Sequence, residues 1–451
     1  MKEMNEQMSW DRLINDKRFG LEDFHDARRG SRSDFQRDFD RLVFSSPFRR
    51  LQNKTQVFPL PGSVFVHNRL THSMEVASVG RSLANEISSA LSAKYADEPW
   101  RGKLDALDEI VGAACLAHDL GNPPFGHSGE KAISTFFSEG AGAVLQKDMT
   151  EAQWADFTHF EGNANSFRLL THQFKGRRQG GFAMTYSMLA SIVKYPYESR
   201  LAGKKNKFGF FSSETDTFKR IADELGLLPR YGAGGEICYA RHPLVYIVEA
   251  ADDICYQVMD IGDAHKLRVL LTDEVIGLFM SFFDVAKRDH MHRAMSHVDD
   301  PNEKIAYLRS CVIGTLVKQC AKAFVENEQT ILSGDFAGTL LDHVDETERR
   351  GYACCSAKAW EKIYCASDVV DVELAGNRII SFLMEKLIHA VRYPELNYSA
   401  LLLNKVPKQY DIAAPDLYGK VQAVLDHVSG MTDVYALDLY RKLYGMSLPA
   451  V

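Results

Sequence analysis

The sequence predicts an all-α protein that forms one large helical domain over residues 1–451. Apolar residues recur every three or four positions, as in amphipathic helices, in most segments where a pattern can be read. Strand-like alternation is rare, and no low-complexity linker or internal repeat divides the chain. The balance of 45% hydrophobic and 25% charged residues is that of a globular protein.

Helical periodicity is clearest in six segments, and one short segment has the character of a strand. The helical segments are residues 74–87, 107–117, 186–193, 244–261, 305–324 and 379–391, and the strand is expected at 236–240. We expect a catalytic core over about residues 50–270, with a helical C-terminal extension over 271–451 packed against it.

Composition and charge favour a cytoplasmic protein that does not bind nucleic acid as its main task. No apolar run approaches the roughly 20 residues that span a bilayer, and the N-terminal segment is polar. The eight cysteines form no C-x-x-C pair, and the net charge is −7. Two local basic stretches keep a role for single-stranded DNA open, although solvated loops explain them equally well: Arg28, Arg29 and Arg32, and Lys204, Lys205 and Lys207.

Three segments carry side chains that bind divalent metals. They are RLTHS (69–73), CLAHDLG (115–121) and EAADDI (249–254). Two imidazoles and two carboxylates suit Mn²⁺, Fe²⁺, Zn²⁺, Co²⁺ or Ni²⁺, and the carboxylates also accept Mg²⁺. No G-x-x-x-x-G-K-[ST] loop is present to hold phosphates, so we expect a metal and side chains to hold them. The predicted metal ligands are His72, His118, Asp119 and one of Asp252 and Asp253.

The helix expected at 244–261 directs acidic residues to one side. At 100° per residue, four acids and a tyrosine fall within a wedge of about 80°, namely Glu249, Asp252, Tyr256, Asp260 and Asp263. A solvated face explains such a cluster, but like charges at helical spacing repel and a bound cation would relieve the repulsion. The opposite side is apolar. Asp252 shares its face with Tyr256 and Asp260, whereas Asp253 points to the edge, so Asp252 is the predicted ligand.

His127 and Glu130 are the predicted acid/base pair. They follow a Pro- and Gly-rich turn and are three residues apart at the start of a helix, a spacing at which the two side chains meet. A carboxylate that orients an imidazole is a common arrangement in general acid/base catalysis. Helix capping by Glu130 explains the pattern as well. The His-Asp pair a few residues earlier favours catalysis.

The order His, His-Asp, Asp resembles the HD superfamily, and more closely the bacterial dGTP triphosphohydrolases. The resemblance begins at FRRLQ (48–52), continues through NKTQVF (53–58), and includes the G-H-x-G-E segment that holds His127. It implies an HD-domain helical bundle that binds one divalent metal, with Mn²⁺ or Mg²⁺ expected first. It also implies hydrolysis of dGTP to a deoxynucleoside and tripolyphosphate, with the other dNTPs left open as substrates.

The same resemblance implies roles for further residues and for partners. Lys194, Tyr195 and Lys207 resemble positions that hold the triphosphate, and Arg69 is expected to contact substrate. Gln52 and Lys54 resemble positions at the deoxyribose and phosphates, and Tyr256 and Asp260 positions at the sugar and its 3′-hydroxyl. A homo-oligomer, expected as a hexamer, and a single-stranded DNA effector are implied by the resemblance alone.

Two other functions remain open. One is a different HD phosphohydrolase, acting on nucleoside monophosphates, cyclic dinucleotides or alarmones, which would not need Lys194, Lys207, Tyr256 or Asp260. The other is a nucleotide or single-stranded DNA sensor built on an HD scaffold. The complete ligand set together with His127 and Glu130 argues against an inactive scaffold.

Overall fold

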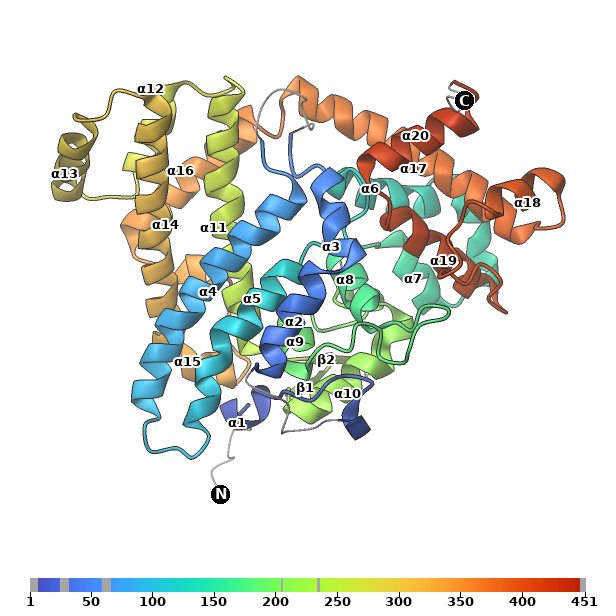
Figure 1. Ribbon diagram of the computed structural model, residues 1–451, viewed down its shortest axis with the longest axis horizontal. Helices are drawn as coiled ribbons and strands as arrows, with labels where there is room; N and C mark the ends of the chain where they lie inside the picture. Colours follow the sequence, from blue (N-terminus) through green and yellow to red (C-terminus); the bar gives the residue numbers. More distant parts are fainter. Residues whose placement is uncertain (1–6, 25–31, 59–65, 204–205, 233–235, 447–451) are drawn as a thin grey trace.

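The computed structural model describes residues 7–24, 32–58, 66–203, 206–232 and 236–446, so Arg28, Arg29, Lys204 and Lys205 lie outside the described residues. The prediction of an all-α protein is confirmed (Figure 1). Among the described residues, extended structure is limited to one antiparallel pair, β1 (Pro229–Tyr231) and β2 (Ile237–Tyr239), and three isolated bridges. β2 lies in the predicted strand. Its partner β1 is fully exposed and begins with proline, so it has no alternating pattern that would reveal it.

Helices follow one another along the chain, and all six predicted helical segments coincide with one. The helices of the first half are α1 (Trp10–Leu13), α2 (Asp34–Val43), α3 (Ser46–Arg50), α4 (Arg69–Lys94), α5 (Leu107–Ala117), α6 (Gly126–Ser138), α7 (Glu151–Thr158), α8 (Gly162–Thr171), α9 (Tyr186–Ser191), α10 (Thr215–Leu225) and α11 (Pro243–Lys266). Those of the second half are α12 (Thr272–Met280), α13 (Val285–Met295), α14 (Pro301–Glu326), α15 (Glu328–Leu332), α16 (Glu346–Lys362), α17 (Ser367–Arg392), α18 (Asn397–Leu403), α19 (Leu417–Ser429) and α20 (Asp433–Leu443).

The larger of two hydrophobic cores is built around α4. This helix packs against α5, α11 and α14, which lie together on the left in Figure 1. Its start is fixed locally, because Asn68 and Thr71 each bind the other's backbone N–H in a capping box. Pro243 and the capping side chain of His242 begin α11 in a similar way. The local signals therefore set where α4 and α11 begin, and their apolar faces bring them together.

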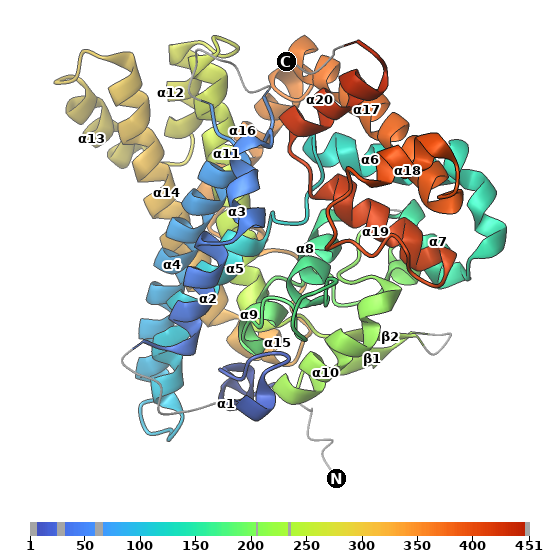
Figure 2. The same ribbon diagram turned by 45° about the vertical axis from the view of Figure 1, so that its right-hand side comes forward.

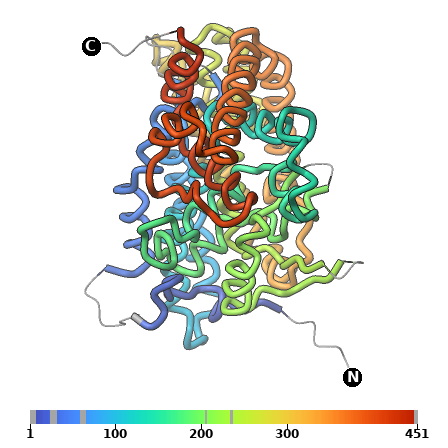
Figure 3. The backbone as a smooth tube through the Cα atoms, turned by 90° about the vertical axis from the view of Figure 1, so that its right-hand side faces the viewer, coloured from blue at the N-terminus to red at the C-terminus, as the bar shows by residue number. Residues whose placement is uncertain are grey.

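A second core joins α6 and α7 to the last helices of the chain. α17 packs along α6 and also contacts α18, α19 and α20 (Figure 2). Seen from the side, these orange and red C-terminal segments lie in front of the blue and cyan helices (Figure 3). Helices α12, α14 and α16 follow residue 270 yet contribute to the first core. The predicted division at residue 270 stays a prediction. None of the described helices is long and apolar enough to cross a bilayer.

Candidate metal centre and active site

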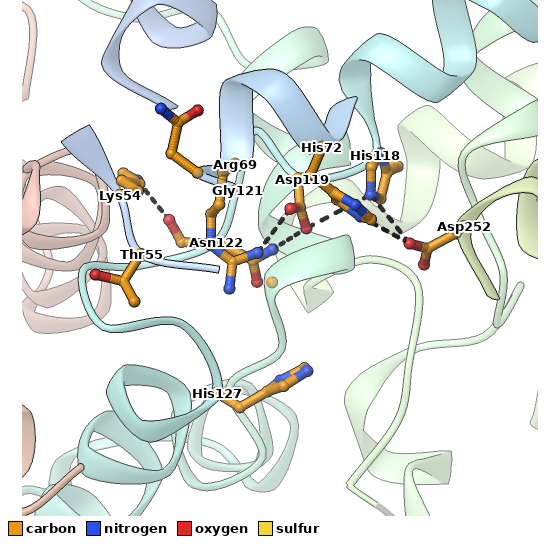
Figure 4. A network of polar contacts seen from close by, with 12 residues as sticks. Lys54, Thr55, Arg69, His72, His118, Asp119, Gly121, Asn122, His127 and Asp252 are labelled. Carbon is orange, nitrogen blue, oxygen red and sulfur yellow. Dashed lines mark hydrogen bonds and ion pairs between the residues drawn. The ribbon is translucent and has the colours of Figure 1, made fainter. Parts of the chain in front are cut away.

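Two histidines and an aspartate meet where α4 and α5 lie side by side. His72 lies in the first turn of α4, and His118 and Asp119 directly follow α5. One ligand atom from each lies within 4.8 Å of the other two, and all three residues are buried. Figure 4 shows both imidazole rings beside the Asp119 carboxylate. A group of this composition is able to hold a divalent ion.

Helix α11 brings Asp252 to the same group. Its Oδ1 lies 3.0 Å from Nε2 of His72 and 3.5 Å from Nε2 of His118. The Asp252 side chain is 34% exposed, whereas that of His72 is 3% exposed. Asp252 is thus the carboxylate that contacts both histidines, and it lies at the open side of the group. Its identity as a ligand stays a prediction.

The hydrogen bonding of His118 fits a metal ligand. Nδ1 lies 2.6 Å from the carbonyl oxygen of Cys115, which only accepts, so Nδ1 carries the proton. In the neutral imidazole Nε2 then keeps its lone pair, and this buried atom makes no hydrogen bond, its nearest carboxylate oxygen being Oδ1 of Asp252 at 3.5 Å. Buried polar atoms without a partner are rare in folded proteins. Coordination of a metal at Nε2 would satisfy the atom, and metal-binding histidines commonly donate their other N–H to a carbonyl.

Asp119 is held by two neighbours that orient its carboxylate. The buried Arg69 donates from Nη1 to Oδ2 at 2.7 Å, and the Asn122 amide donates to Oδ1. Burial raises the pKa of Asp119, but the charges of Arg69, His118 and His72 outweigh it and hold the pKa below the ordinary value. Arg69, which was predicted to contact substrate, is thus hydrogen-bonded to Asp119, a candidate metal ligand.

The acidic face of α11 is not an uncompensated cluster, and the expected charge repulsion is relieved by other elements. Three of its acids have partners: Glu249 pairs with Lys194 and Arg241, Asp263 with His67, and Asp260 accepts from the Tyr364 hydroxyl. The inference that the repulsion calls for a cation was therefore wrong for these three, because residues outside α11 already partner them. The opposite apolar face is fully buried, as predicted: Ile247, Ala251, Ile254, Val258 and Ile261.

His127 and Glu130 meet at the start of α6. Nδ1 of His127 lies 2.8 Å from Oε2 of Glu130, and Oε1 accepts the Gly162 N–H at 2.8 Å. The His127 side chain is 66% exposed and that of Glu130 is 10% exposed. The negative charge of Glu130 raises the pKa of His127. Figure 4 shows His127 apart from the candidate metal group and free of contact with it.

The lysines expected at the triphosphate are paired with buried carboxylates. Nζ of Lys194 lies 2.9 Å from Glu249, and Nζ of Lys207 lies 2.7 Å from Glu161. Tyr195 lies against Lys194, whose Nζ is 5.9 Å from the ring centroid. Both lysines are therefore already paired in this structure.

Lys54, predicted at the deoxyribose and phosphates, is buried and hydrogen-bonded to backbone, and its contact with substrate stays a prediction. It is 2% exposed, and its Nζ donates to the carbonyl oxygens of Asn122, at 2.5 Å, and Ser429, at 2.8 Å. Burial, with the nearby charge of Arg50, lowers the pKa of Lys54 to about 7. Its neighbour Gln52 is exposed. In this structure Lys54 joins two backbone segments.

Tyr364 is a site residue that the sequence argument missed. Its hydroxyl donates to Oδ2 of Asp260 at 2.8 Å, and its ring stacks on Tyr256 at 5.8 Å between centroids. Burial raises the pKa of Asp260 to about 8. Tyr364 follows α16, 104 residues after Asp260, and no local pattern marks it. Only the packing of α16 on α11 brings these residues together.

A large cavity lies away from the candidate metal group. Its volume is about 860 Å³, and its lining includes four arginines, Arg41, Arg50, Arg177 and Arg178, and no acidic residue. His427, another lining residue, is buried and its Nε2 has no hydrogen-bond partner. None of the predicted site residues lines this cavity. The cavity and the candidate metal group are therefore separate features of the fold.

Comparison with known families and proteins agrees with this geometry. The HD domain family matches residues 69–190, and the phosphohydrolase-associated domain matches residues 357–442. A deoxyguanosinetriphosphate triphosphohydrolase-like protein of Pseudomonas aeruginosa is 37% identical over 458 residues, covering 98% of this chain and 100% of its own. One of Synechocystis is 35% identical over 98% of this chain and 100% of its own.

A third relative carries the enzyme name without qualification. The deoxyguanosinetriphosphate triphosphohydrolase of Yersinia enterocolitica is 30% identical over 91% of this chain and 93% of its own. Identity of this extent over nearly the whole length, with the HD match spanning His72, His118, Asp119 and His127, places the chain in a family. The protein belongs to the deoxyguanosinetriphosphate triphosphohydrolase family of HD-domain phosphohydrolases.

Proposed function

We propose that the protein hydrolyses deoxynucleoside triphosphates, dGTP first among them, to a deoxynucleoside and tripolyphosphate. The buried Nε2 of His118, which makes no hydrogen bond and lies 3.5 Å from Asp252 in the group that His72, His118 and Asp119 form, is the observation that carries the proposal. His72, His118, Asp119 and Asp252 would hold one divalent ion, Mn²⁺ or Mg²⁺ first. When bound, the ion supplies positive charge that stabilises developing negative charge on the phosphoryl oxygens.

His127 is the proposed proton-transfer group. Its exposed Nε2 side faces away from Glu130 and is available to an attacking water or to the leaving 5′-oxygen. Glu130 holds Nδ1 in place and stabilises the imidazolium form. The two residues are proposed to act as one unit.

Other side chains would bind the parts of the substrate that do not react. Lys194, Tyr195 and Lys207 are proposed to hold the triphosphate, because ammonium groups bind phosphate as point charges. Tyr256, Asp260 and Gln52 are proposed at the sugar. Arg69 and Lys54 are proposed to support the site, through Asp119 and Asn122 respectively.

The remaining partners and the location are proposals as well. We propose a cytoplasmic homo-oligomer, a hexamer by family resemblance. The arginine-lined cavity supports a single-stranded DNA effector, because phosphate backbones bind cationic, acid-free surfaces. The alternatives are another HD phosphohydrolase and a nucleotide sensor.

One experiment separates these functions. The purified protein is incubated with each of the four dNTPs and with GTP, in Mn²⁺ and in Mg²⁺, and the products are resolved by chromatography. We expect deoxyguanosine and tripolyphosphate, strongly reduced in His127→Ala and absent in Asp252→Ala. Release of monophosphate would indicate a different bond cleavage, and no turnover of any dNTP in either metal would contradict the proposal.

A further inference from the structure

The turn that leads to His127 has an unusual backbone. Phe125 and Gly126, the two residues before it, have φ angles of 63° and 56°. Glycine is required at 126, because a Cβ there would lie 2.4 Å from Nη2 of Arg69. Phe125 carries a side chain that disfavours this left-handed conformation, which persists only where the surroundings hold it. The direction in which His127 points therefore depends on what holds Phe125.

Those contacts come from the last helices of the chain. Asp433, the first residue of α20, is 7% exposed, and its Oδ1 accepts the Phe125 N–H at 2.9 Å. Its Oδ2 accepts the Thr55 N–H at 2.8 Å. The Phe125 ring lies on α17 at Gly376, where a Cβ would lie 2.8 Å from Cβ and Cγ of Phe125.

The other end of the same turn is tied to the same region. Lys54 bridges the carbonyl oxygens of Asn122 and Ser429, and Figure 4 shows its contact with Asn122. The Asn165 amide donates to the Gly121 carbonyl at 2.7 Å and to the Ser429 hydroxyl at 3.1 Å. The turn lies in the HD match, whereas Gly376, Ser429 and Asp433 lie in the phosphohydrolase-associated match.

We propose that Asp433 is a positioning residue that holds Phe125 in its left-handed conformation and so aims His127 at the reacting phosphate. This rests on the proposed role of His127. A carboxylate is needed because it accepts from two backbone N–H groups at once. An amide of the same shape would turn its own NH₂ toward one of these donors. Gly376 completes the arrangement by giving the Phe125 ring a place against α17.

The first test replaces Asp433 with asparagine and observes His127 directly. The His127 ring is followed by NMR in isotope-labelled protein and assigned by the signal lost in His127→Ala. Its charged neighbours are Glu130, Arg69 and Lys207. We expect the His127 pKa to fall by about half a pH unit or more in Asp433→Asn, because the ring loses its alignment with Glu130. An unchanged pKa would overturn the proposal.

Asp416→Asn is the matched control. Asp416 likewise lies at the start of a C-terminal helix, as the N-cap of α19, but its carboxylate accepts the Gly419 N–H of that helix's own first turn and is exposed. Its replacement should leave the His127 signal unchanged. Because this readout needs no turnover, it tests the proposal even if no dNTP is cleaved, and the two failures can be told apart.

Activity gives the second test. We expect Asp433→Asn to lower kcat about tenfold with Mn²⁺ affinity unchanged, and to lower it no further in a His127→Ala background, because linked residues are not additive. An equal loss in both backgrounds would show that Asp433 does not act through His127, and would overturn the proposal.

Gly376→Ala keeps the proposal testable if Asp433→Asn does not fold. Alanine favours a helix more than glycine does, so lost helix stability would not explain a lost function. Its methyl group should displace Phe125, lower the His127 pKa and lower kcat. Gly314→Ala in α14, where nothing lies within 4 Å of the added Cβ, is the control and should behave as the unaltered protein. Gly376→Ala with an unaltered His127 signal and kcat would overturn the proposal.

Discussion

Oε2 of Glu130 lies 2.8 Å from Nδ1 of His127, so that a buried carboxylate stands directly behind an exposed imidazole. The other carboxylate oxygen is fixed by the Gly162 N–H. This fixed acceptor orients the ring and stabilises its protonated form. The relationship makes Glu130 testable separately from the metal group.

Glu130→Gln should lower kcat about ten- to hundredfold, and His127→Ala about 10²- to 10⁴-fold. The amide keeps the shape but stabilises an imidazolium poorly. Steady-state kinetics measure both variants, and calorimetry should find Mn²⁺ affinity unchanged. Full activity in Glu130→Gln would assign the pair to helix capping.

Metal binding should stabilise the folded protein. At a free Mn²⁺ concentration about 100 times the Kd, the gain is about 3 kcal/mol, because only the folded state assembles the ligands. Thermal unfolding with and without Mn²⁺ measures it. His118→Ala and Asp252→Asn should remove the gain, whereas His172→Ala, a histidine at the arginine-lined cavity, should retain it. An equal gain in all variants would mean that the ion binds elsewhere.

His67 should make stability fall as the pH rises. Burial lowers the pKa of His67, but hydrogen bonds with Asp263 and Glu75 outweigh it and raise the pKa to about 9. Because the folded protein binds the His67 proton more tightly than the unfolded chain does, this proton stabilises the folded protein. The stabilisation is complete below the unfolded pKa of about 6.5 and is lost as the pH rises through about 9. The loss is roughly 2–3 kcal/mol. Urea unfolding at pH 6 and pH 9.5 should show it in the unaltered protein and much less of it in His67→Gln. An equal loss of stability between pH 6 and pH 9.5 in the unaltered protein and in His67→Gln would contradict the assignment of this loss to His67.

Lys207→Met should raise KM for dGTP about tenfold and change kcat little, if the lysine holds the triphosphate in ground and transition states alike. Steady-state kinetics over a range of dGTP concentrations measure this. Lys322→Met is the control, because Lys322 is also paired, with Asp345 at 3.2 Å, but is exposed on α14. A fall in kcat at constant KM would place Lys207 at the reacting phosphate instead.

The arginine-lined cavity should bind single-stranded DNA in a salt-dependent manner. Fluorescence anisotropy with a labelled oligonucleotide should show affinity that falls steeply between 50 and 200 mM salt, on the order of 10³-fold for six phosphate contacts. Replacing Arg177 and Arg178 together by Glu should abolish binding, and Arg293→Glu on α13 should not. Equal binding by all three proteins would exclude the cavity as the DNA site.

Much of the fold and the local parts of the site could be predicted from the sequence because they depend on spacing along the chain. Apolar periodicity located α4, α5, α11 and α17, and each of these helices exists. The spacing of His127 and Glu130 predicted their contact, since residues three apart on a helix face each other. The 100° step between neighbouring residues of α11 likewise placed Asp252 on the face of Tyr256 and Asp260, and Asp253 at the edge of that face. The order of the candidate ligands along the chain in turn supplied the family resemblance.

Contacts between distant segments could not be predicted, because no local pattern encodes which helices pack together. Lys54 was expected at the substrate, and the packing of α19 buries it between two carbonyl groups instead. The acids of α11 were expected to need a cation, but basic residues outside the helix pair with Glu249 and Asp263, and the Tyr364 hydroxyl donates to Asp260. Tyr364 had no mark in the sequence, and no local pattern linked Asp433 to the turn before His127.

The sequence by itself thus determined the helices, the residue types of the site and the pairs within one helical turn. The tertiary structure alone decided which carboxylates stay available, which cations are already paired, and what holds the turn before His127. The physical reason is that hydrogen bonds and burial depend on distance in space. Asp433 and Phe125 are 308 residues apart in the chain, yet Oδ1 of Asp433 lies 2.9 Å from the backbone nitrogen of Phe125 in the folded protein.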